Sequence, residues 1–438
     1  MSVFKYLKSV TIPQNKHTDG LVVMPLPVPD CVYIALNQGS CAPAHPLVRT
    51  GEYVRVGQLI ADGEGPLSCP IHASVSGTVS GIVTLMSCEG VPCPHIVIKS
   101  DKSQNTADIS PVSPVGRKEF IEALRNSGIV DPSEGNYPLS YKFDVPAGSI
   151  DTLLVNGVEC ESFLTSDHMT MMTYSPDILS GIHMIMRSLN IPNCVIAISD
   201  NKSDAVLLFN KHISDLYIED ICVKELPSVY PIGEENSVVY AATGRLIPAG
   251  KQAKDVGVVT CNVSCILKFK QYLDSGMPLV SKAVTVDGDA VSRPQNVEIP
   301  VGTLVSEIMT LCRGDFKPVR KIVFGGPLYG MAVPHAEISI GKLVGGIVLF
   351  TEKAAITNPE TQCIRCGKCV QACPIGLMPL ELSEAYKCDD WVTLRKMNAQ
   401  QCVGCNACSF ICPARKPLAF QIIQAKSSLD REEGRENG

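Results

Sequence analysis

Two copies of one cysteine pattern near the carboxyl end constrain this chain more than any other feature of its sequence. Each copy reads C-x2-C-x2-C-x3-C-P; the first runs from Cys363 to Pro374 and the second from Cys402 to Pro413. Bacterial proteins use this spacing to hold [4Fe–4S] clusters. Three cysteines at two-residue gaps let a short loop wrap one face of a cubane, so the fourth thiolate has to come from elsewhere.

In proteins with two such clusters, the fourth cysteine of each run ligates the cluster of the other run. We therefore expect two interlaced ligand sets. The first consists of Cys363, Cys366, Cys369 and Cys412, and the second consists of Cys373, Cys402, Cys405 and Cys408. A pair of four-cysteine zinc sites is the alternative, because zinc sites also use C-x2-C pairs. Three consecutive C-x2-C steps closed by Cys-Pro favour iron–sulfur clusters over zinc.

The remaining sequence indicates a folded protein that stays in the cytoplasm. The amino-terminal "MSVFKYLKSVTIPQ" lacks the apolar core and cleavage site of a signal peptide. No apolar run approaches the ~18 residues that span a bilayer, so membrane attachment has to come through a partner. Because cytoplasmic thiols are kept reduced, metal ligation explains the 20 cysteines better than disulfides do.

Composition sets the scale of the molecule and excludes one class of partner. The chain has 438 residues, of which 45% are apolar and 19% charged, so it buries most of itself. At about 150 residues a domain, roughly three domains are expected. The net charge is −6 and no basic block interrupts the chain, which argues against nucleic acid as a partner.

Residues 21–112 are rich in Val and Ile and are punctuated by glycine and proline. Short alternating runs between the glycines predict tight hairpins in a small all-β domain that resembles the barrel-sandwich hybrid of biotinyl and lipoyl carriers. Those carriers attach their cofactor to an exposed lysine, and residues 17–98 contain none, which excludes a carrier role. His45, His72 and His95 have no spaced partner cluster, so we interpret them as structural or exposed residues.

From about 113 to 264 the pattern changes to alternating helix and strand. "RKEFIEALRNSG" and "DILSGIHMIMRSLN" have the period of helices, whereas "DTLLVNGVE" and "CVIAISD" are typical of buried strands. This alternation predicts a mainly parallel sheet covered by helices, which binds ligands beyond the carboxyl ends of its strands. "NGVECES", residues 156–162, follows one such end, and a turn at 233–235 leads into a further predicted helix.

The rest of the chain is expected to form two more modules and a tail. Residues 265–350 show a strand, turn, strand and helix followed by "KIVFGGPLYGMAVP", which predicts a β-grasp module that we interpret as a packing domain. Residues 355–425 form a helical ferredoxin-like module, with two short helices between the cysteine runs, Cys388 as an unligated core cysteine and a closing helix at "PLAFQIIQAK". Residues 426–438 read as a solvated polar tail. The expected fold class is therefore multidomain α/β plus β with a carboxyl-terminal dicluster module.

Taken in this order, the parts resemble the RnfC family, which is one subunit type of the Rnf electron-transport complex, over nearly the whole chain. The resemblance rests on both cysteine runs and on "PIHASVSGTV", "LLVNGVECESFLTSDHMTMM", "YPIGEENSVVYAATGR", "VTVDGDAVSRP" and "VFGGPLYGMAVP". It implies a peripheral subunit on the cytoplasmic face of a membrane complex that passes electrons between ferredoxin and NAD and couples them to ion translocation. Other subunits of that complex, and ferredoxin or a partner reductase, are the implied partners.

The resemblance also implies that the central domain is similar to the flavin-bearing subunit of respiratory NADH dehydrogenase, with FMN and the nicotinamide cofactor at a glycine-rich loop. The candidate flavin or nucleotide residues carried by "NGVECES" and "GEE" are Asn156, Gly157, Glu159, Glu161, Gly233, Glu234 and Glu235. The alternative for these glutamates is a role as helix caps or surface residues.

One departure from the family pattern concerns the phosphate-binding loop. Where the family has a loop of the type G-x-G-G-A-G-F-P-T, this chain reads "GIVDPSEGNYPLSYKF". Asp131, Pro132 and Glu134 add bulk, remove one N–H and are expected to place two negative charges near an anion. Like charges at roughly 4 Å repel by about 1 kcal/mol even in water. The changed loop argues against NAD(H) and leaves FMN open.

Two functions of different classes are consistent with these features. The first is a redox subunit of an Rnf-type oxidoreductase, in which electrons pass between flavin and two [4Fe–4S] clusters. The second is an electron-transfer adaptor that has lost NADH binding and feeds another reductase, as in proline-reductase-associated proteins of similar layout. An iron–sulfur scaffold without turnover is a third, weaker alternative.

Overall fold

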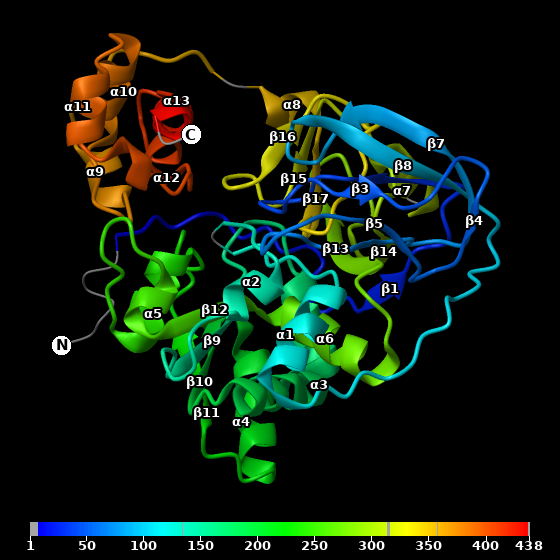
Figure 1. The fold of residues 1–438 in the computed structure, drawn as a ribbon. Helices are drawn as coiled ribbons and strands as arrows, with labels where there is room; N and C mark the ends of the chain where they lie inside the picture. The colour runs from blue at the N-terminus through cyan, green and yellow to red at the C-terminus, as the bar shows by residue number, and fades with distance from the viewer. Residues whose placement is uncertain (1–7, 134, 313–315, 357, 437–438) are drawn as a thin grey trace.

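The computed structural model describes residues 8–133, 135–312, 316–356 and 358–436. Four parts are arranged around one another (Figure 1). A β domain and a mixed sheet lie beside each other, an α/β domain lies below them, and a small helical module joined by an extended connection lies over one end of the α/β domain. Among the described residues, no helix is long and apolar enough to cross a membrane.

The amino-terminal domain consists of two antiparallel sheets. The larger has the order β2-β8-β7-β4, with β2 at Cys31–Ala35, β8 at Pro92–Ser100, β7 at Gly77–Met86 and β4 at Tyr53–Val54. The smaller has the order β3-β5-β6, with β3 at His45–Pro46, β5 at Leu59–Asp62 and β6 at Ile71–His72. Alternating Val and Ile side chains from both sheets meet in one buried core. This arrangement follows from the period-2 pattern of the sequence.

Two of the three histidines in this domain are buried and one is exposed. Burial lowers the pKa of His72 to about 3, and it also lowers the pKa of His95, whose Nδ1 lies 2.9 Å from the carbonyl oxygen of Cys93. Both rings are therefore neutral parts of the core. His45 lies exposed on β3.

The α/β domain is built on a four-stranded parallel sheet with the order β11-β10-β9-β12. Its strands are β9 at Thr152–Gly157, β10 at Asn193–Ser199, β11 at Ile221–Leu226 and β12 at Val258–Asn262. The α-helices are α1 at Gly116–Asn126, α2 at Leu139–Phe143, α3 at Ser166–Leu189, α4 at Ser203–Asp215, α5 at Glu235–Thr243 and α6 at Val263–Ser275, and short 3-10 turns lie at Asp200–Lys202 and Ala253–Val256.

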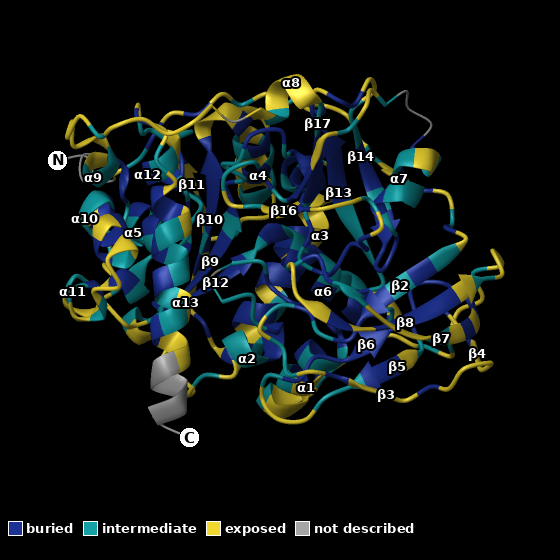
Figure 2. Cartoon of the chain, turned by 90° about the horizontal axis from the view of Figure 1, so that it is seen from above, coloured by how far each residue is buried: buried dark blue, intermediate teal, exposed yellow. Residues whose placement is uncertain are grey.

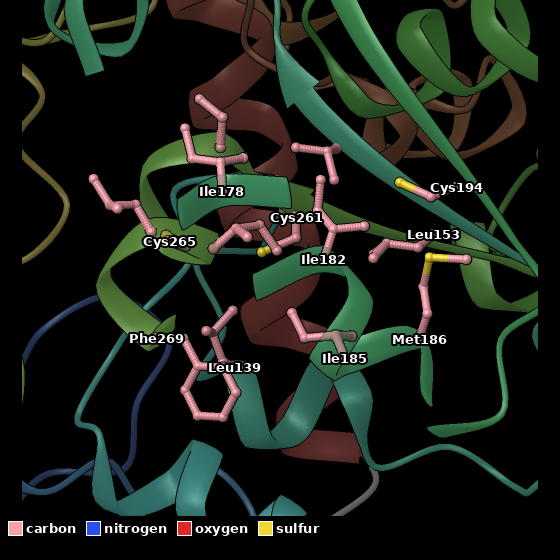
Figure 3. Close-up of a cluster of buried hydrophobic side chains, with 14 of the residues drawn as sticks. Leu139, Leu153, Ile178, Ile182, Ile185, Met186, Cys194, Cys261, Cys265 and Phe269 are labelled. Carbon is pink, nitrogen blue, oxygen red and sulfur yellow. The ribbon is translucent and has the colours of Figure 1, made fainter. Parts of the chain in front are cut away.

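The largest core of the molecule lies on one face of this sheet. Ile178, Ile182 and Ile185 on α3 point toward Cys261 and Cys265, which come from β12 and α6 (Figure 3). Helix α6 belongs to this core, so the α/β domain continues to Ser275 and crosses the expected boundary at 264. The apolar period of "CILKFKQYL" faces α3, which is why the helix packs here.

A six-stranded mixed sheet follows, with the order β1-β14-β13-β17-β15-β16. Its elements are β1 at Val23–Pro25, β13 at Ser281–Asp287, β14 at Gln295–Pro300, α7 at Val305–Leu311, β15 at Lys321–Phe324, β16 at Met331–Val333 and β17 at Gly346–Phe350, followed by α8 at Glu352–Ala355. The expected order of strand, turn, strand and helix is present. Strand β1 pairs with β14, so residues 23–25 belong to this sheet although they fall within the range expected for the amino-terminal domain.

The helical module contains α9 at Lys368–Ala372, α10 at Pro379–Lys387, α11 at Trp391–Lys396, α12 at Ala407–Phe410 and α13 at Leu418–Glu436, with a 3-10 turn at Ala399–Gln401. Helices α10 and α11 are the two that were expected between the cysteine runs. Figure 2 shows α10 and α13 on the same side of the molecule, each with buried and exposed faces.

Two expectations for this module are wrong. Cys388 is exposed at the end of α10 and is not a core cysteine, because it follows the last apolar position of that helix. Helix α13 continues through most of the segment expected to be a polar tail, and Leu429 within it is fully buried against α10 and α11. Leu429 continues the helical spacing of Ile422 and Ala425, which explains the extension.

Candidate functional site

The two cysteine loops have the same backbone conformation. The interval that separates Cys363 from Cys402 also separates three pairs of residues with positive φ: Arg365 and Gly404, Gly367 and Asn406, and Gly376 and Arg415. The same interval separates the starts of α9 and α12, and of α10 and α13. The left-handed residues turn each loop back toward its own cysteines, so the module is an internal repeat of one loop–helix unit.

Backbone N–H groups in these loops are directed at cysteine sulfurs. The N–H of Arg365 donates to Sγ of Cys363 and the N–H of Leu377 donates to Sγ of Cys373, both at 3.3 Å. N–H groups of the second loop likewise lower the pKa of Cys402 and Cys405, although burial raises both more strongly. Such donors stabilise thiolates, and hydrogen bonds to sulfur set the potentials of iron–sulfur clusters. The chemistry of the donor set therefore fits two iron–sulfur clusters.

The fourth cysteine of each run lies near the other run. Burial, followed by the charges of neighbouring thiols, raises the pKa of Cys408 to about 12, and Cys373 is one of those neighbours. Cys373 acts in the same direction on Cys402 and Cys405. Cys412 raises the pKa of Cys369, after burial. These neighbours support the two interlaced ligand sets, which stay a prediction. Within the described ranges, no group of three or more His, Cys, Asp or Glu side chains is arranged around a single metal ion.

Polar contacts join the second cysteine loop to the rest of the chain. The hydroxyl of Tyr230 donates to the carbonyl oxygen of Cys405 at 2.6 Å, and Nζ of Lys426 donates to that of Cys402 at 3.0 Å. Nδ2 of Asn406 donates to the carbonyl oxygen of Leu328 at 2.7 Å. The second loop is therefore held against both the α/β domain and the mixed sheet.

A cavity of about 330 Å³ lies at the carboxyl ends of β9 and β12. The chain builds β9, β10 and β11 outward in one direction and then places β12 on the other side of β9, so β9 and β12 flank the topological switch point. Ligands of open α/β sheets bind in the crevice at this point. Asn156 and Asn262 are register partners there, and both line the cavity.

The cavity brings together most of the predicted flavin or nucleotide residues. Its lining includes Asn156, Glu159, Glu161, Gly233, Glu234 and Glu235, together with Cys402 from the second cysteine run. Gly157 does not line it. A Cβ at Gly157 would lie 2.7 Å from the sulfur of Met171, so this glycine instead lets α3 pack closely on β9.

Two of the predicted glutamates cap helices. Oε1 of Glu159 accepts the N–H of Asp167 at 2.9 Å and Oε2 accepts that of His168 at 3.2 Å, at the start of α3. Glu234 is the N-cap of α5 and accepts the N–H groups of Asn236 and Ser237. The alternative of a helix-cap role is therefore the one the structure shows for both side chains.

The other two glutamates make different contacts. Glu161 accepts the N–H of Tyr329 at 2.6 Å and of Leu328 at 3.3 Å, which links the loop after β9 to the "GGPLYG" loop of the mixed sheet. Burial raises its pKa. Glu235 accepts a hydrogen bond from the hydroxyl of Thr260 and lies 3.8 Å from Nζ of Lys142.

The expectation that Asp131 places its charge near a bound anion is wrong. Its carboxylate is fully buried, lies 3.7 Å from Nζ of Lys142 and accepts the N–H groups of Ser133 and Asn262. Burial alone would raise its pKa, but Lys142 and these donors bring the pKa below its ordinary value. Glu134, the second expected charge, lies outside the described residues.

Sequence reasoning missed several residues that line the cavity. Tyr230, Asn262, Tyr329 and Lys426 come from four separate segments that only the tertiary fold brings together. The glycines of "GGPLYG" were the available signal for one of them. A Cβ at Gly326 would lie 2.2 Å from the carboxylate of Glu161, so this loop needs glycine to reach the site.

Three family models match parts of the chain. The RnfC barrel sandwich hybrid domain matches residues 4–103, the Nuo51 FMN-binding domain matches residues 124–271 and a 4Fe-4S dicluster domain matches residues 362–416. The barrel-sandwich prediction is thus confirmed, and the dicluster match decides for [4Fe–4S] clusters against zinc. The Nuo51 match supports FMN as a further cofactor of this domain type.

Curated relatives cover most of the chain. It is 33% identical over 374 residues to the RnfC-type subunit of a proton-translocating ferredoxin:NAD(+) oxidoreductase complex of Clostridium ljungdahlii, with 84% of this chain and 81% of the relative covered. It is 33% identical over 409 residues to the corresponding subunit of the Na(+)-translocating complex of Acetobacterium woodii, with 92% and 91% covered. An NAD+-reducing [NiFe]-hydrogenase of known structure shares the fold, with a TM-score of 0.53 and 12% identity over 71% of this chain and 66% of that one.

Proposed function

We propose, from the premise that this chain belongs to the RnfC family of subunits of the ion-translocating ferredoxin:NAD(+) oxidoreductase complexes, that it relays electrons through two [4Fe–4S] clusters. It does so as a peripheral subunit of a membrane-associated complex. The finer assignment is to the cytoplasmic face, with ferredoxin and the other subunits of the complex as partners. Electron flow through this protein is coupled to ion translocation by those other subunits.

The observation that carries this proposal is the position of the cavity. It lies at the switch point of the sheet, is lined by the residues proposed for the flavin and reaches Cys402 and Val403 in the second cysteine run. A cofactor in this cavity would be next to the second cluster. The family model for an FMN-binding domain covers the same sheet.

The residues of the cavity fit a flavin. Carboxylates and amides accept or donate hydrogen bonds, which suits the hydroxyl groups and ring edge of a flavin, and Asn156, Glu161 and Glu235 offer them. Lys426 is the cation in the lining that suits the phosphate. A bound flavin would interconvert the two-electron chemistry of a nicotinamide and the one-electron chemistry of the clusters. Buried Asp167 and Glu234 have raised pKa values, first because of burial, which limits negative charge around the cavity.

A second candidate function is an adaptor that holds clusters without binding NAD(H). Helix N-termini are the usual site for a pyrophosphate. The chain's own Glu159, Glu234 and Asn262 already accept the N–H groups at the starts of α3, α5 and α6. This self-capping favours the adaptor over a dinucleotide site of the usual construction.

Anaerobic purification followed by iron, sulfide and flavin analysis tests the proposal. We expect about four irons for each of two cubanes, about one flavin per chain and a partial loss of visible absorption on adding NADH. Clusters without flavin and without a response to NADH would replace the first function by the adaptor. A protein without clusters would contradict both.

A pair of variants tests whether the cavity is the flavin site. Asn156→Leu removes the amide that donates to the carbonyl oxygen of Gly233 at 2.9 Å inside the cavity. Asn193→Leu removes an exposed amide at the opposite end of the neighbouring strand β10. We expect the flavin content to fall in the first variant only, while both keep their iron. Equal flavin content in both variants would remove the cavity from the proposal.

A further inference from the structure

A second and larger groove lies beside the second cysteine loop. Its volume is about 780 Å³, and it runs between α5, the loop 246–252 and the helical module. Pro374 and Val403, the residues that follow Cys373 and Cys402, both line it. These two cysteines belong to one predicted ligand set, so the groove lies next to that cluster. We call it the lysine groove because of the charges described next.

The charge of the lysine groove is opposite to that of the chain. Lys8, Lys251 and Lys426 line it, and no Asp or Glu occurs among the described residues of its lining. The whole chain has a net charge of −6. The three lysines come from the amino-terminal segment, the loop 246–252 and α13, so the fold gathers them from three distant parts of the sequence.

Two of these lysines are tied to the loops that carry the cluster ligands. Nζ of Lys426 donates to the carbonyl oxygen of Cys402 at 3.0 Å. Nζ of Lys8 lies 3.5 Å from the position that a Cβ would take at Gly376, in the loop after Cys373. Positive charge is thus fixed at both edges of the surface over the second cluster.

The chemistry of the neighbouring cluster selects the kind of partner. A nicotinamide transfers a hydride, which is a two-electron step, whereas a cubane accepts one electron at a time. A groove that adjoins the cluster directly, on the other side of α5 from the flavin cavity, therefore suits a one-electron carrier. Lysines that surround such a contact steer a negatively charged partner into place.

We propose that the lysine groove is the docking surface for an acidic protein that carries single electrons and exchanges them directly with the cluster of Cys373, Cys402, Cys405 and Cys408. In this exchange, one electron leaves the reduced carrier and reduces the cluster by one, without a proton or a bond change. The proposal rests on the proposed electron-relay function and adds the surface through which the relay is reached.

Two charge-reversal variants with equal changes in net charge test the proposal. Lys8→Glu combined with Lys251→Glu reverses two charges of the groove and leaves Lys426 with its contact to Cys402. Lys211→Glu combined with Lys224→Glu is the control, because these exposed lysines lie on α4 and β11, at the far end of the α/β domain (Figure 1). The full chain is purified anaerobically with its clusters and mixed with a reduced small acidic ferredoxin, and cluster reduction is followed by the loss of visible absorption.

At low ionic strength we expect the second-order rate constant to fall at least about tenfold in the groove variant and less than about twofold in the control. The difference should shrink as salt shortens the Debye length to about 3 Å near 1 M. Reduction by the methyl viologen radical cation, which is positively charged, should not slow in either variant.

A groove variant whose rate with the ferredoxin matches that of the control would overturn the docking surface and leave the relay function intact. Loss of iron or of reduction by the viologen radical in the wild-type protein would instead contradict the relay function itself. The two failures are therefore distinguishable.

Discussion

Replacing Lys142 by methionine tests the buried charge network beside the candidate cavity. Its side chain is 9% exposed, and its Nζ lies 3.7 Å from Asp131 and 3.8 Å from Glu235. At an effective dielectric constant of about 20, each pair attracts by about 4 kcal/mol, and the burial of the charges offsets part of this. Removing the shared cation from a buried ion pair costs about 3–5 kcal/mol, and we expect a loss in this range for Lys142→Met.

The pH dependence of this loss has a definite sign. In the wild type, the folded-state pKa of Asp131 lies below its ordinary value, so its stabilising contribution is present above pH ~4 and is lost as the pH falls through the lowered pKa. Without Lys142, burial should raise that pKa above the unfolded value. The variant then gains stability as acid protonates Asp131. We therefore expect the gap between wild type and variant to narrow from pH 7 to pH 5.

Thermal unfolding followed by circular dichroism under argon measures the effect. A loss of about 3–5 kcal/mol corresponds to a fall of about 10 °C in the Tm of a domain of this size. Lys270→Met is the control, because its ammonium pairs with the half-exposed Asp274 on α6 and should contribute less than about 1 kcal/mol. A Tm change in Lys142→Met no larger than in the control, or a gap that is the same at pH 7 and pH 5, would refute the reasoning.

Three further predictions follow from single positions. Cys373→Ala should impair the cluster of the second run and Cys412→Ala that of the first run, as read by EPR and iron content; the reverse pattern would exclude interlaced ligation. Gly326→Ala should displace the carboxylate of Glu161, which would be 2.2 Å from the new Cβ, and lower the flavin content, whereas Gly345→Ala, with its nearest atom at 3.9 Å, should not. Burial lowers the pKa of Lys202 to about 8, so the wild type should gain stability between pH ~8 and ~10.5. Lys202→Met should lose this gain in urea titrations, and an unchanged slope would contradict the burial.

The parts of the fold with a strong local pattern could be predicted from the sequence. Alternating apolar residues predicted the hairpins of the amino-terminal domain, and the helix–strand alternation predicted a parallel sheet, which is the four-stranded sheet of β9 to β12. The cysteine spacing predicted two equivalent loops. Each of these signals is contained within a few turns of chain, so no knowledge of distant contacts was needed.

Features that depend on distant contacts could not be predicted. Strand β1 has only three residues and pairs with β14, far away in the sequence, so its own pattern did not reveal its sheet. Asp131 was expected to face an anion, but Lys142 and the N–H of Asn262 draw it inward, and neither partner adjoins it in the sequence. The same holds for the lysine groove, which exists only where three segments converge.

The most direct test of the account is the iron and acid-labile sulfide content of the anaerobically purified full chain, together with EPR of the reduced form. Two cubanes should give about eight irons and about eight sulfides per chain and signals of two interacting clusters. One or two zinc ions without sulfide, or a single cluster in the intact protein, would contradict the central claim that the two cysteine loops form an electron relay.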